Sequence, residues 1–383
     1  MRDIDTLNKW LIAEGRLIGD EIAIVKGYCQ ALVALGVPLA RARIAQTYAN
    51  PLLSAWGIIW TAEKTHRYTV ASEVLSTGAW HGSPFEHVVT TRSSLRQRLT
   101  GVDLDGKHTL YRELAEAGAT DFLAMALEYG DGAVQGASFT TAAPEGFSDR
   151  HLEALEHTRH ALAAALEPIA MRESQKSLLQ TYLGQGPAIE IGQGHIKRGE
   201  SRKLNAAILF ADLRGFTAKS ETWPEDQLLA VMGDYFEMVV GAIQDHGGDV
   251  LKFMGDGILA VFGDGEATKE ACQSAASAAQ AALQKLETYN QTAIQPIAFV
   301  VGLDYGDVTY GNIGSPDRLD FTVVGRAVNT ASRVQELCKT LGEHVLMTRD
   351  VAVQLGTQTR SLGRHRMRGL PEAVEVFTMD PDP

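Results

Sequence analysis

The sequence is poor in cysteine and has neither a long apolar run nor a block of like charge. Only three of its 383 residues are cysteines, Cys29, Cys272 and Cys338, and they are far apart with no CxxC spacing. This pattern excludes a disulfide framework and a zinc knuckle, and it is typical of buried thiols in a reducing compartment.

No stretch has the composition of a signal peptide or a membrane span. Residues 1–10 mix charged and apolar side chains, and the most apolar early stretch contains Lys26, Gln30 and Pro38. The formal net charge is −12, with both signs interspersed along the chain. This argues against nucleic acid or an anionic membrane as the main partner. We therefore expect a cytoplasmic protein that binds neither.

The length is sufficient for two or three domains, and the pattern separates three regions: 1–147, 148–199 and 200–383. In the first region, two alternating runs at residues 121–128 and 133–140 flank a Gly-Asp-Gly turn, which predicts an antiparallel hairpin. Ser83 followed by Pro84 predicts a capped helix start. These features indicate an α+β domain.

The second region has a helical pattern, with leucine and isoleucine on one stripe from Leu152 to Ile169. Pro168 predicts a kink or a break into two helices, because proline lacks a backbone donor. Two interpretations fit the stripe: a helix packed on its own domain, or a parallel two-chain signalling helix. Gly184, Gly186 and the later glycines predict a flexible junction after it.

The third region alternates strand and helix patterns, which predicts an antiparallel or mixed sheet covered by helices. The expected strands are residues 204–211, 297–305, 308–313 and 320–324, with terminal strands around Val345, Arg366 and Val374. A hairpin is expected at residues 250–262. The expected helices are residues 225–245, 267–289 and 327–339.

Two aspartates in this region each follow an apolar run and stand close to a glycine. Asp212 ends the run at residues 204–211, and Asp256 lies between Gly255 and Gly257. Either one alone is commonly a helix cap or a turn former. Together they predict a site for hard divalent cations, which bind carboxylates and substrate phosphates. After Asp212, residues 213–217 can turn backbone amides toward a phosphate.

A second cluster contains Asn329 and Arg333, which are four residues apart and share a face if the segment is helical. An amide and a guanidinium aimed together suit a ribose and a charged phosphoryl group. The alternative is an ordinary solvated helix face.

Three motifs in order give the third region a family resemblance. They are FADLRGFT at residues 210–217, KFMGDG at residues 252–257 and VGRAVNTASR at residues 324–333. Residues 204–378 resemble the catalytic domain of the class III nucleotidyl cyclases. The resemblance implies a ferredoxin-like α+β fold with a mixed, mainly antiparallel sheet.

The resemblance also implies roles for individual residues. Asp212, Asp256 and the Leu213 carbonyl match the ligands of two divalent cations, Mg²⁺ or Mn²⁺, and Asn329 and Arg333 match the catalytic residues that orient the ribose and stabilise charge on the α-phosphate. The remaining substrate-binding positions are Gly215, Phe216, Thr217 and, on the terminal phosphates, Arg368.

Base choice follows from Lys252 and Thr322, which match the two purine-selecting positions of the family. Lysine donates to the unprotonated N1 of adenine, and the threonine hydroxyl accepts from its 6-amino group. Guanine presents the opposite pattern. ATP is therefore the expected substrate of an adenylate cyclase, with guanylate cyclase activity or a non-catalytic nucleotide-binding or dimerisation module as the alternatives.

In this family the active site forms between two catalytic domains, so the resemblance implies a homodimer with two sites at the protomer interface. Gly247, Gly248 and Asp249 are reminiscent of diguanylate cyclases, but Val250 and Leu251 do not fit that signature. Residues 1–147 resemble a GAF-type sensor domain, the alternative being a dimerisation domain of another α+β kind. Its regulatory ligand or partner is unknown.

Overall fold

The computed structural model describes residues 3–47, 53–263, 267–356 and 359–379. It divides into two compact units, Met1–Leu178 and Leu179–Pro383, each of which is described by itself. This division falls inside a helix, whereas the domain boundaries predicted from the sequence lie at residues 147/148 and 199/200. Those two boundaries remain predictions.

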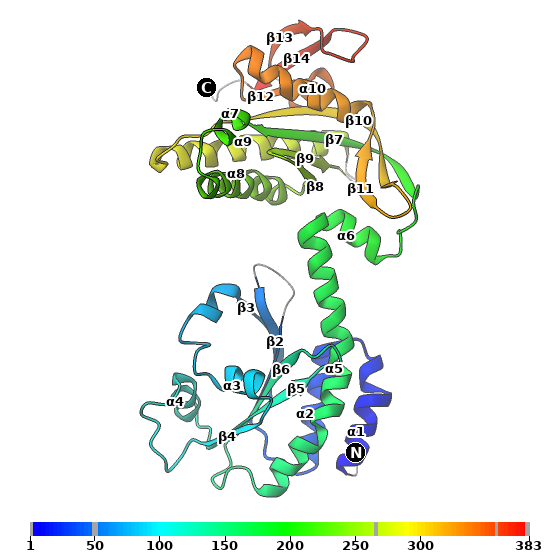
Figure 1. Ribbon diagram of the computed structural model, residues 1–383. Helices are drawn as coiled ribbons and strands as arrows, with labels where there is room; N and C mark the ends of the chain where they lie inside the picture. Colours follow the sequence, from blue (N-terminus) through cyan, green and yellow to red (C-terminus); the bar gives the residue numbers. More distant parts are fainter. Residues whose placement is uncertain (1–2, 48–52, 264–266, 357–358, 380–383) are drawn as a thin grey trace. The chain divides into compact units, whose positions relative to one another are not determined.

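The first unit is an α+β domain built on one antiparallel sheet (Figure 1). The sheet has six strands in the order β3-β2-β1-β6-β5-β4. The elements are α1 (Ile4–Ala13), the 3-10 turn η1 (Gly15–Leu17), α2 (Glu21–Ala34), β1 (Arg41–Thr47), β2 (Leu53–Thr61), β3 (Thr65–Ala71), the 3-10 turn η2 (Ser72–Ser76), α3 (Pro84–Thr91), β4 (Leu95–Arg98), α4 (Thr109–Glu116), β5 (Asp121–Glu128), β6 (Val134–Thr141) and α5 (Asp149–Leu183).

Two apolar clusters lie on opposite faces of this sheet. Leu11 of α1, Ile24 of α2 and Leu162 of α5 pack with side chains of β1, β2, β5 and β6 on one face. Val88 of α3 and Tyr111 of α4 pack with alternate side chains of β5 on the other. The alternation of side chains along β5 therefore supplies both cores.

The predicted hairpin and helix cap of this unit are confirmed. Strands β5 and β6 pair in antiparallel register from Asp121 opposite Thr141 to Glu128 opposite Val134. The Ser83 hydroxyl accepts a hydrogen bond from the Glu86 backbone N–H at 3.1 Å, and Pro84 is in the first turn of α3.

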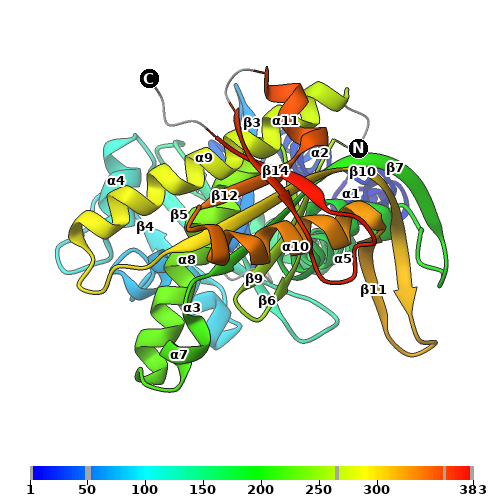
Figure 2. The same ribbon diagram turned by 90° about the horizontal axis from the view of Figure 1, so that it is seen from above.

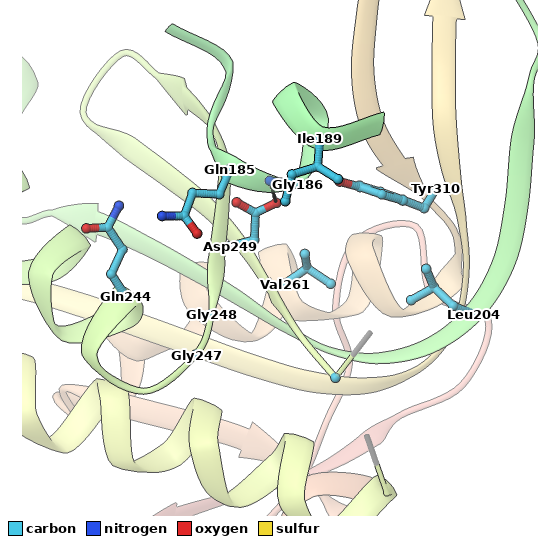
Figure 3. A pocket seen from close by; sticks show the side chains of 11 residues that line it. Gln185, Gly186, Ile189, Leu204, Gln244, Gly247, Gly248, Asp249, Val261 and Tyr310 are labelled. Atoms are coloured by element: carbon cyan, nitrogen blue, oxygen red, sulfur yellow. Dashed lines mark hydrogen bonds between the residues drawn. The ribbon is translucent and has the colours of Figure 1, made fainter. Parts of the chain in front are cut away.

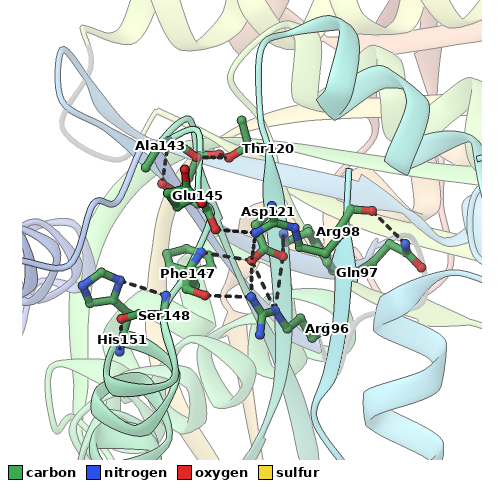
Figure 4. Close-up of polar contacts among 12 residues, drawn as sticks. Arg96, Gln97, Arg98, Thr120, Asp121, Ala143, Glu145, Phe147, Ser148 and His151 are labelled. Carbon is green, nitrogen blue, oxygen red and sulfur yellow. Dashed lines mark hydrogen bonds and ion pairs between the residues drawn. The ribbon is translucent and has the colours of Figure 1, made fainter. Parts of the chain in front are cut away.

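A buried carboxylate holds the segment that leads into α5 (Figure 4). Asp121 is fully buried, and it accepts hydrogen bonds from Arg96 at 2.7 Å and from the backbone N–H of Phe147 at 3.0 Å. Arg98 donates to the Glu145 carbonyl at 2.5 Å and also faces Asp121 at 3.6 Å. If the segment at residues 145–147 moved away, the buried Asp121 carboxylate would lose a hydrogen-bond partner, which is costly for a buried charge. The network therefore holds the start of α5 in place.

Of the kink or break predicted at Pro168, the break into two helices is wrong, since α5 is one helix of 35 residues with Pro168 inside it. Proline removes one backbone donor, which normally disfavours a helix interior. Here Leu166 and Ile169, on either side, are both buried in the core of the first unit, whereas Pro168 is exposed. Packing of the apolar stripe thus outweighs the missing hydrogen bond.

The second unit contains the remaining elements, arranged around a larger sheet (Figures 1 and 2). They are α6 (Gln185–Gly192), β7 (Ser201–Leu213), α7 (Phe216–Ser220), α8 (Glu225–Asp245), β8 (Asp249–Met254), β9 (Gly257–Phe262), α9 (Thr268–Thr292), β10 (Phe299–Gly314), β11 (Leu319–Val324), α10 (Arg326–Leu341), β12 (Val345–Thr348), α11 (Arg349–Leu355), β13 (Thr359–His365) and β14 (Val374–Met379).

This sheet is mixed and mainly antiparallel, as predicted. Seven strands follow the order β13-β14-β12-β10-β7-β9-β8, and β11 pairs with β10 beside that path. Only the β10–β12 pairing is parallel among the described strands. Helices α8 and α9 pack on one face of the sheet, and α10 packs on the other. The predicted α+β fold class is confirmed.

Several local predictions differ from the structure. Residues 297–305 and 308–313 were expected as two strands, yet β10 runs without a break from Phe299 to Gly314 because it pairs continuously with the 13-residue strand β7. Arg366 lies just beyond β13. The short helices α7 and α11 were not predicted, since each is too brief to show a helical period.

The junction predicted as flexible contains the ordered helix α6. A Cβ on Gly184 would lie 2.5 Å from the Val250 carbonyl oxygen, and one on Gly186 would lie 2.2 Å from an Asp249 carboxylate oxygen. These glycines therefore allow the backbone to approach β8 closely, which is a different use of glycine from flexibility.

The three cysteines are free and buried. Across the part of the chain that the structure describes, no helix combines the length and the apolar character that a membrane span requires.

Candidate active site

The structure brings Asp212 and Asp256 together. Asp212 is the penultimate residue of β7, and Asp256 lies in the tight turn between β8 and β9. Because Ala211 is paired with Ile258 across β7 and β9, the β8–β9 turn lies beside the end of β7. Partial burial, followed by the neighbouring Asp212 carboxylate, raises the pKa of Asp256 above its ordinary value.

The two carboxylates open onto a cavity of about 590 Å³. Gly215 is the N-cap of α7 with φ +72°, a left-handed conformation that glycine adopts without strain. The predicted residues Leu213, Gly215 and Phe216 all line this cavity, and Thr217 is within α7, its side chain falling outside the described part of the structure. The lining residues are Asp212, Leu213, Arg214, Gly215, Phe216, Asp256 and Lys339.

This donor set fits a divalent cation. Two adjacent carboxylates and a backbone carbonyl are hard oxygen ligands of the kind that Mg²⁺ and Mn²⁺ take, with the remaining positions left for water and phosphate. The pKa of Asp256 is raised first by burial and then by repulsion from the Asp212 carboxylate, and a bound cation would relieve that repulsion. Among the described residues no group of three or more His, Cys, Asp or Glu side chains could hold a metal ion.

Asp212 also accepts hydrogen bonds from two side chains that were not predicted. The Lys339 ammonium lies 2.7 Å from Asp212 Oδ2, and Gln335 Nε2 lies 3.3 Å from the same oxygen. Both residues belong to α10 and are four apart, so they share a face. Sequence reasoning missed them because the motif around Arg333 gives no sign that this helix reaches the end of β7.

Lys252 lies on β8 and Thr322 on β11, two strands that are not hydrogen-bonded to each other in the described sheet but approach in space. Lys252 forms an ion pair with Asp320, which precedes Thr322 by two residues and so projects from the same face of β11. Thr322 is buried, and the Lys252 side chain is 24% exposed. The structure thus brings the two predicted purine-selecting residues close together, and it adds Asp320, which sequence reasoning did not identify.

Asn329 and Arg333 share one face of α10, as predicted, but it is not the face that meets Asp212. Residues two apart on a helix point in different directions, so Arg333 diverges from Gln335, which contacts Asp212. Asn329 is exposed, and Arg333 forms an ion pair with Glu336 at 2.5 Å. Within one chain, the described lining of the cavity of Asp212 and Asp256 includes neither Asn329 nor Arg333.

Arg368 is exposed in the turn between β13 and β14. Its neighbour Met367 is buried in a cluster with Val334 and Cys338 of α10, so the turn is held against this helix. Arg368 does not line the cavity of the two aspartates.

A second cavity, of about 310 Å³, lies where α6 meets β8 (Figure 3). The Gly186 backbone N–H donates to Asp249 Oδ2 at 3.1 Å, and Figure 3 shows Tyr310 beside this contact. Since β8 also carries Lys252, this contact joins α6 to a strand that carries a predicted site residue. The lining residues are Gln185, Gly186, Ile189, Leu204, Gln244, Gly247, Gly248, Asp249, Val261, Gly263 and Tyr310.

Comparison with known proteins gives a family match over the second unit. The model of the adenylate and guanylate cyclase catalytic domain matches residues 200–380. An adenylate cyclase of Anabaena cylindrica is 31% identical over 196 residues, which are 49% of this chain and 39% of the relative. Adenylate cyclase 1 of Rhizobium meliloti is 25% identical over 193 residues, which are 49% of this chain and 29% of the relative. The chain thus spans well under half the length of these relatives.

Solved structures of cyclases also align with the chain. A bacterial light-regulated adenylyl cyclase is 29% identical with a TM-score of 0.42, and the alignment covers 47% of this chain and 91% of that one. The adenylyl cyclase CyaB from P. aeruginosa is 25% identical with a TM-score of 0.43, and the alignment covers 48% of this chain and 97% of that one.

Proposed function

Because residues 200–380 belong to the adenylate and guanylate cyclase catalytic domain family, we propose that this chain is an adenylate cyclase that converts ATP to 3′,5′-cyclic AMP and pyrophosphate. The observation that carries the proposal is the pair of adjacent carboxylates, Asp212 and Asp256, at one cavity beside the strand that carries Lys252. Adenylate cyclase relatives support the choice of reaction.

Asp212, Asp256 and the Leu213 carbonyl hold two divalent cations, Mg²⁺ or Mn²⁺, in this proposal. When bound, these cations would lower the pKa of the ribose 3′-hydroxyl and neutralise negative charge on the phosphates. Gly215 and Phe216 line the same cavity, where backbone amides at the start of α7 meet the phosphates. The chain's own contribution here is to position the triphosphate at the end of β7.

Adenine is selected by Lys252 and Thr322. The Lys252 ammonium donates to adenine N1, and the Thr322 hydroxyl accepts from the 6-amino group. Guanine places a protonated N1 before the ammonium and a carbonyl oxygen before the hydroxyl, so Lys252 is left facing another donor. The ion pair with Asp320 holds Lys252 beside Thr322 before the base arrives.

Asn329 and Arg333 complete the site. The Asn329 amide orients the ribose, and the Arg333 guanidinium stabilises the charge that develops on the α-phosphate during in-line attack by the 3′-oxygen. To do so, Arg333 exchanges its ion pair with Glu336 for the phosphate. Arg368 contacts the terminal phosphates in this scheme.

A homodimer is part of the proposal, since within one chain Asn329 and Arg333 are not among the described residues that line the cavity of Asp212 and Asp256. Lys339 and Gln335 occupy the face of α10 toward Asp212, and Asn329 and Arg333 occupy a different face. A second copy of the chain supplies the missing set to each site, with two equivalent sites per dimer. The GAF-like first unit, with its unidentified ligand or partner, regulates this arrangement.

The test is product formation by the purified full-length protein. With ATP and Mn²⁺ we expect cyclic AMP, with GTP at least tenfold less cyclic product, and with Asp256→Asn no measurable product in either case. Asp317→Asn, an exposed aspartate at the β10–β11 turn, is the matched control and should retain activity. Equal product from the parent and Asp256→Asn would overturn the site, and a preference for GTP would overturn the assignment of the base.

A further inference from the structure

Asp212 is neutralised within its own chain. Its Oδ2 atom accepts hydrogen bonds from both the Lys339 ammonium, at 2.7 Å, and the Gln335 amide, at 3.3 Å. Lys339 also lines the cavity into which Asp212 and Asp256 open. A positive charge from α10 therefore already occupies the place where a cation would bind Asp212.

The two donors differ in how easily they can leave. The Lys339 side chain is 51% exposed, so its four-carbon stem can swing into solvent at little cost. Gln335 is 7% exposed and is a buried residue of α10, so its side chain is much less free to leave. Gln335 is also neutral, so a cation on Asp212 does not repel it, whereas an ammonium and a divalent ion a few ångströms apart repel strongly.

We propose that Lys339 is the resident counter-ion of this carboxylate pair, and that a divalent cation binds only by displacing the Lys339 ammonium from Asp212. The inference rests on the proposed metal-binding role of Asp212 and Asp256. Metal binding is then an exchange of one positive charge for another. Without metal, the Lys339 ammonium keeps Asp212 and Asp256 from being two uncompensated adjacent carboxylates. Because the metal has to displace this ammonium, the affinity of the site for metal is lower than the two carboxylates alone would give.

The test is direct Mn²⁺ binding, measured from the electron paramagnetic resonance signal of free Mn²⁺ titrated into metal-stripped, full-length protein without nucleotide. Binding is the readout because Lys339 is also near the phosphate cavity, where its loss would affect turnover for other reasons. We expect Lys339→Gln to bind Mn²⁺ about tenfold more tightly than the parent, and Lys339→Arg, which keeps the charge, to stay within about twofold of it.

Two further variants separate this inference from the proposed function. Lys285→Gln removes a lysine that pairs with Asp245 at 3.3 Å on the far helices α8 and α9, and should leave Mn²⁺ affinity unchanged. Asp256→Asn should abolish binding. If Asp256→Asn abolishes binding but Lys339→Gln binds no more tightly than the parent, the counter-ion role is wrong and the metal site stands. If Asp256→Asn binds as the parent does, both assignments fail.

Discussion

At the scale of single residues, Lys252 and Thr322, the pair proposed to select the purine, depend on a partner outside their own motifs. Lys252 is fixed by the carboxylate of Asp320, which belongs to a hairpin 68 positions further along the chain. The sequence motifs identify Lys252 and Thr322, but the ion pair arises only when β11 lies beside β8. Long-range pairs of this kind, like Lys339 with Asp212, cannot be read from local spacing.

Asp320→Asn should weaken use of ATP without unfolding the protein. The change leaves the Lys252 ammonium without its charged partner, so the side chain samples more rotamers and meets N1 of adenine less often. We expect kcat/KM for ATP to fall about threefold to tenfold and the ratio of ATP to GTP turnover to fall with it. Asp317→Asn, in the same turn region, is the control. If Asp320→Asn has the same kcat/KM for ATP and the same ratio of ATP to GTP turnover as this control, Asp320 does not position Lys252.

Asp304 gives the second unit a pH-dependent stability. It is 5% exposed and accepts a hydrogen bond from the Thr348 hydroxyl at 2.5 Å. Burial raises the pKa of Asp304 to about 6. Since an unfolded aspartate titrates near about 3.9, the folded state holds the proton more tightly, and its contribution to stability is full below pH 4 and lost as the pH rises through about 6.

Asp304→Asn removes this dependence. Between pH 4 and pH 7.5 we expect the free energy of unfolding of the parent to fall by roughly 2 kcal/mol relative to the variant. Thermal or urea unfolding of the second unit at several pH values measures the difference. Asp307→Asn, an exposed neighbour on the same strand, should follow the parent. Parallel curves for the parent and Asp304→Asn would contradict the assignment of the shift to this carboxyl.

At the scale of elements, the long patterned helices and strands were predictable, and the errors have local causes. Helix α8 begins and ends at the predicted residues, because its apolar period runs unbroken for 21 residues. Pro168 was expected to interrupt its helix and the junction glycines to make the chain flexible, because these are the usual conformational preferences of proline and glycine. Burial beside Pro168 and the approach of Gly186 to Asp249 reverse those preferences, and both depend on contacts between distant segments.

The contact of α6 with β8 should tolerate no side chain at position 186. A Cβ there would lie 2.2 Å from Asp249 Oδ2 and 2.5 Å from the Tyr310 hydroxyl, so Gly186→Ala must move α6 or β8. We expect a loss of about 1–3 kcal/mol in stability of the second unit and lower cyclase activity, because β8 carries Lys252. Gly192→Ala on the same helix meets no atom within 4 Å and should change stability by less than about 0.5 kcal/mol. Equal unfolding profiles for the two variants would show that the α6 contact does not constrain β8.

At the scale of the whole molecule, the proposed division of each active site between two chains would make dimer assembly necessary for activity. The family resemblance predicted this division, and the absence of Asn329 and Arg333 from the described lining of the Asp212 and Asp256 cavity supports the proposal. Helix α10 contacts Asp212 through one face and carries Asn329 and Arg333 on another, so in the proposed dimer a single helix would serve two different sites.

Mixing two inactive variants should therefore restore activity. Asp256→Asn removes the metal set and Arg333→Ala removes the phosphate set, and each homodimer should be inactive. When the two are unfolded and refolded together in equal amounts, half of the dimers contain one of each, and each of these has one intact site of two. The expected activity is about a quarter of the parent value, measured as cyclic AMP per total protein.

A second mixture combines the parent with a chain that carries both substitutions. Its mixed dimers have no intact site, so only the parent homodimers are active, and the cyclic AMP formed per total protein should fall to about a quarter of the parent value. If the first mixture stays inactive while the parent, refolded in the same way, recovers its activity, each chain builds its sites alone and the shared arrangement is wrong.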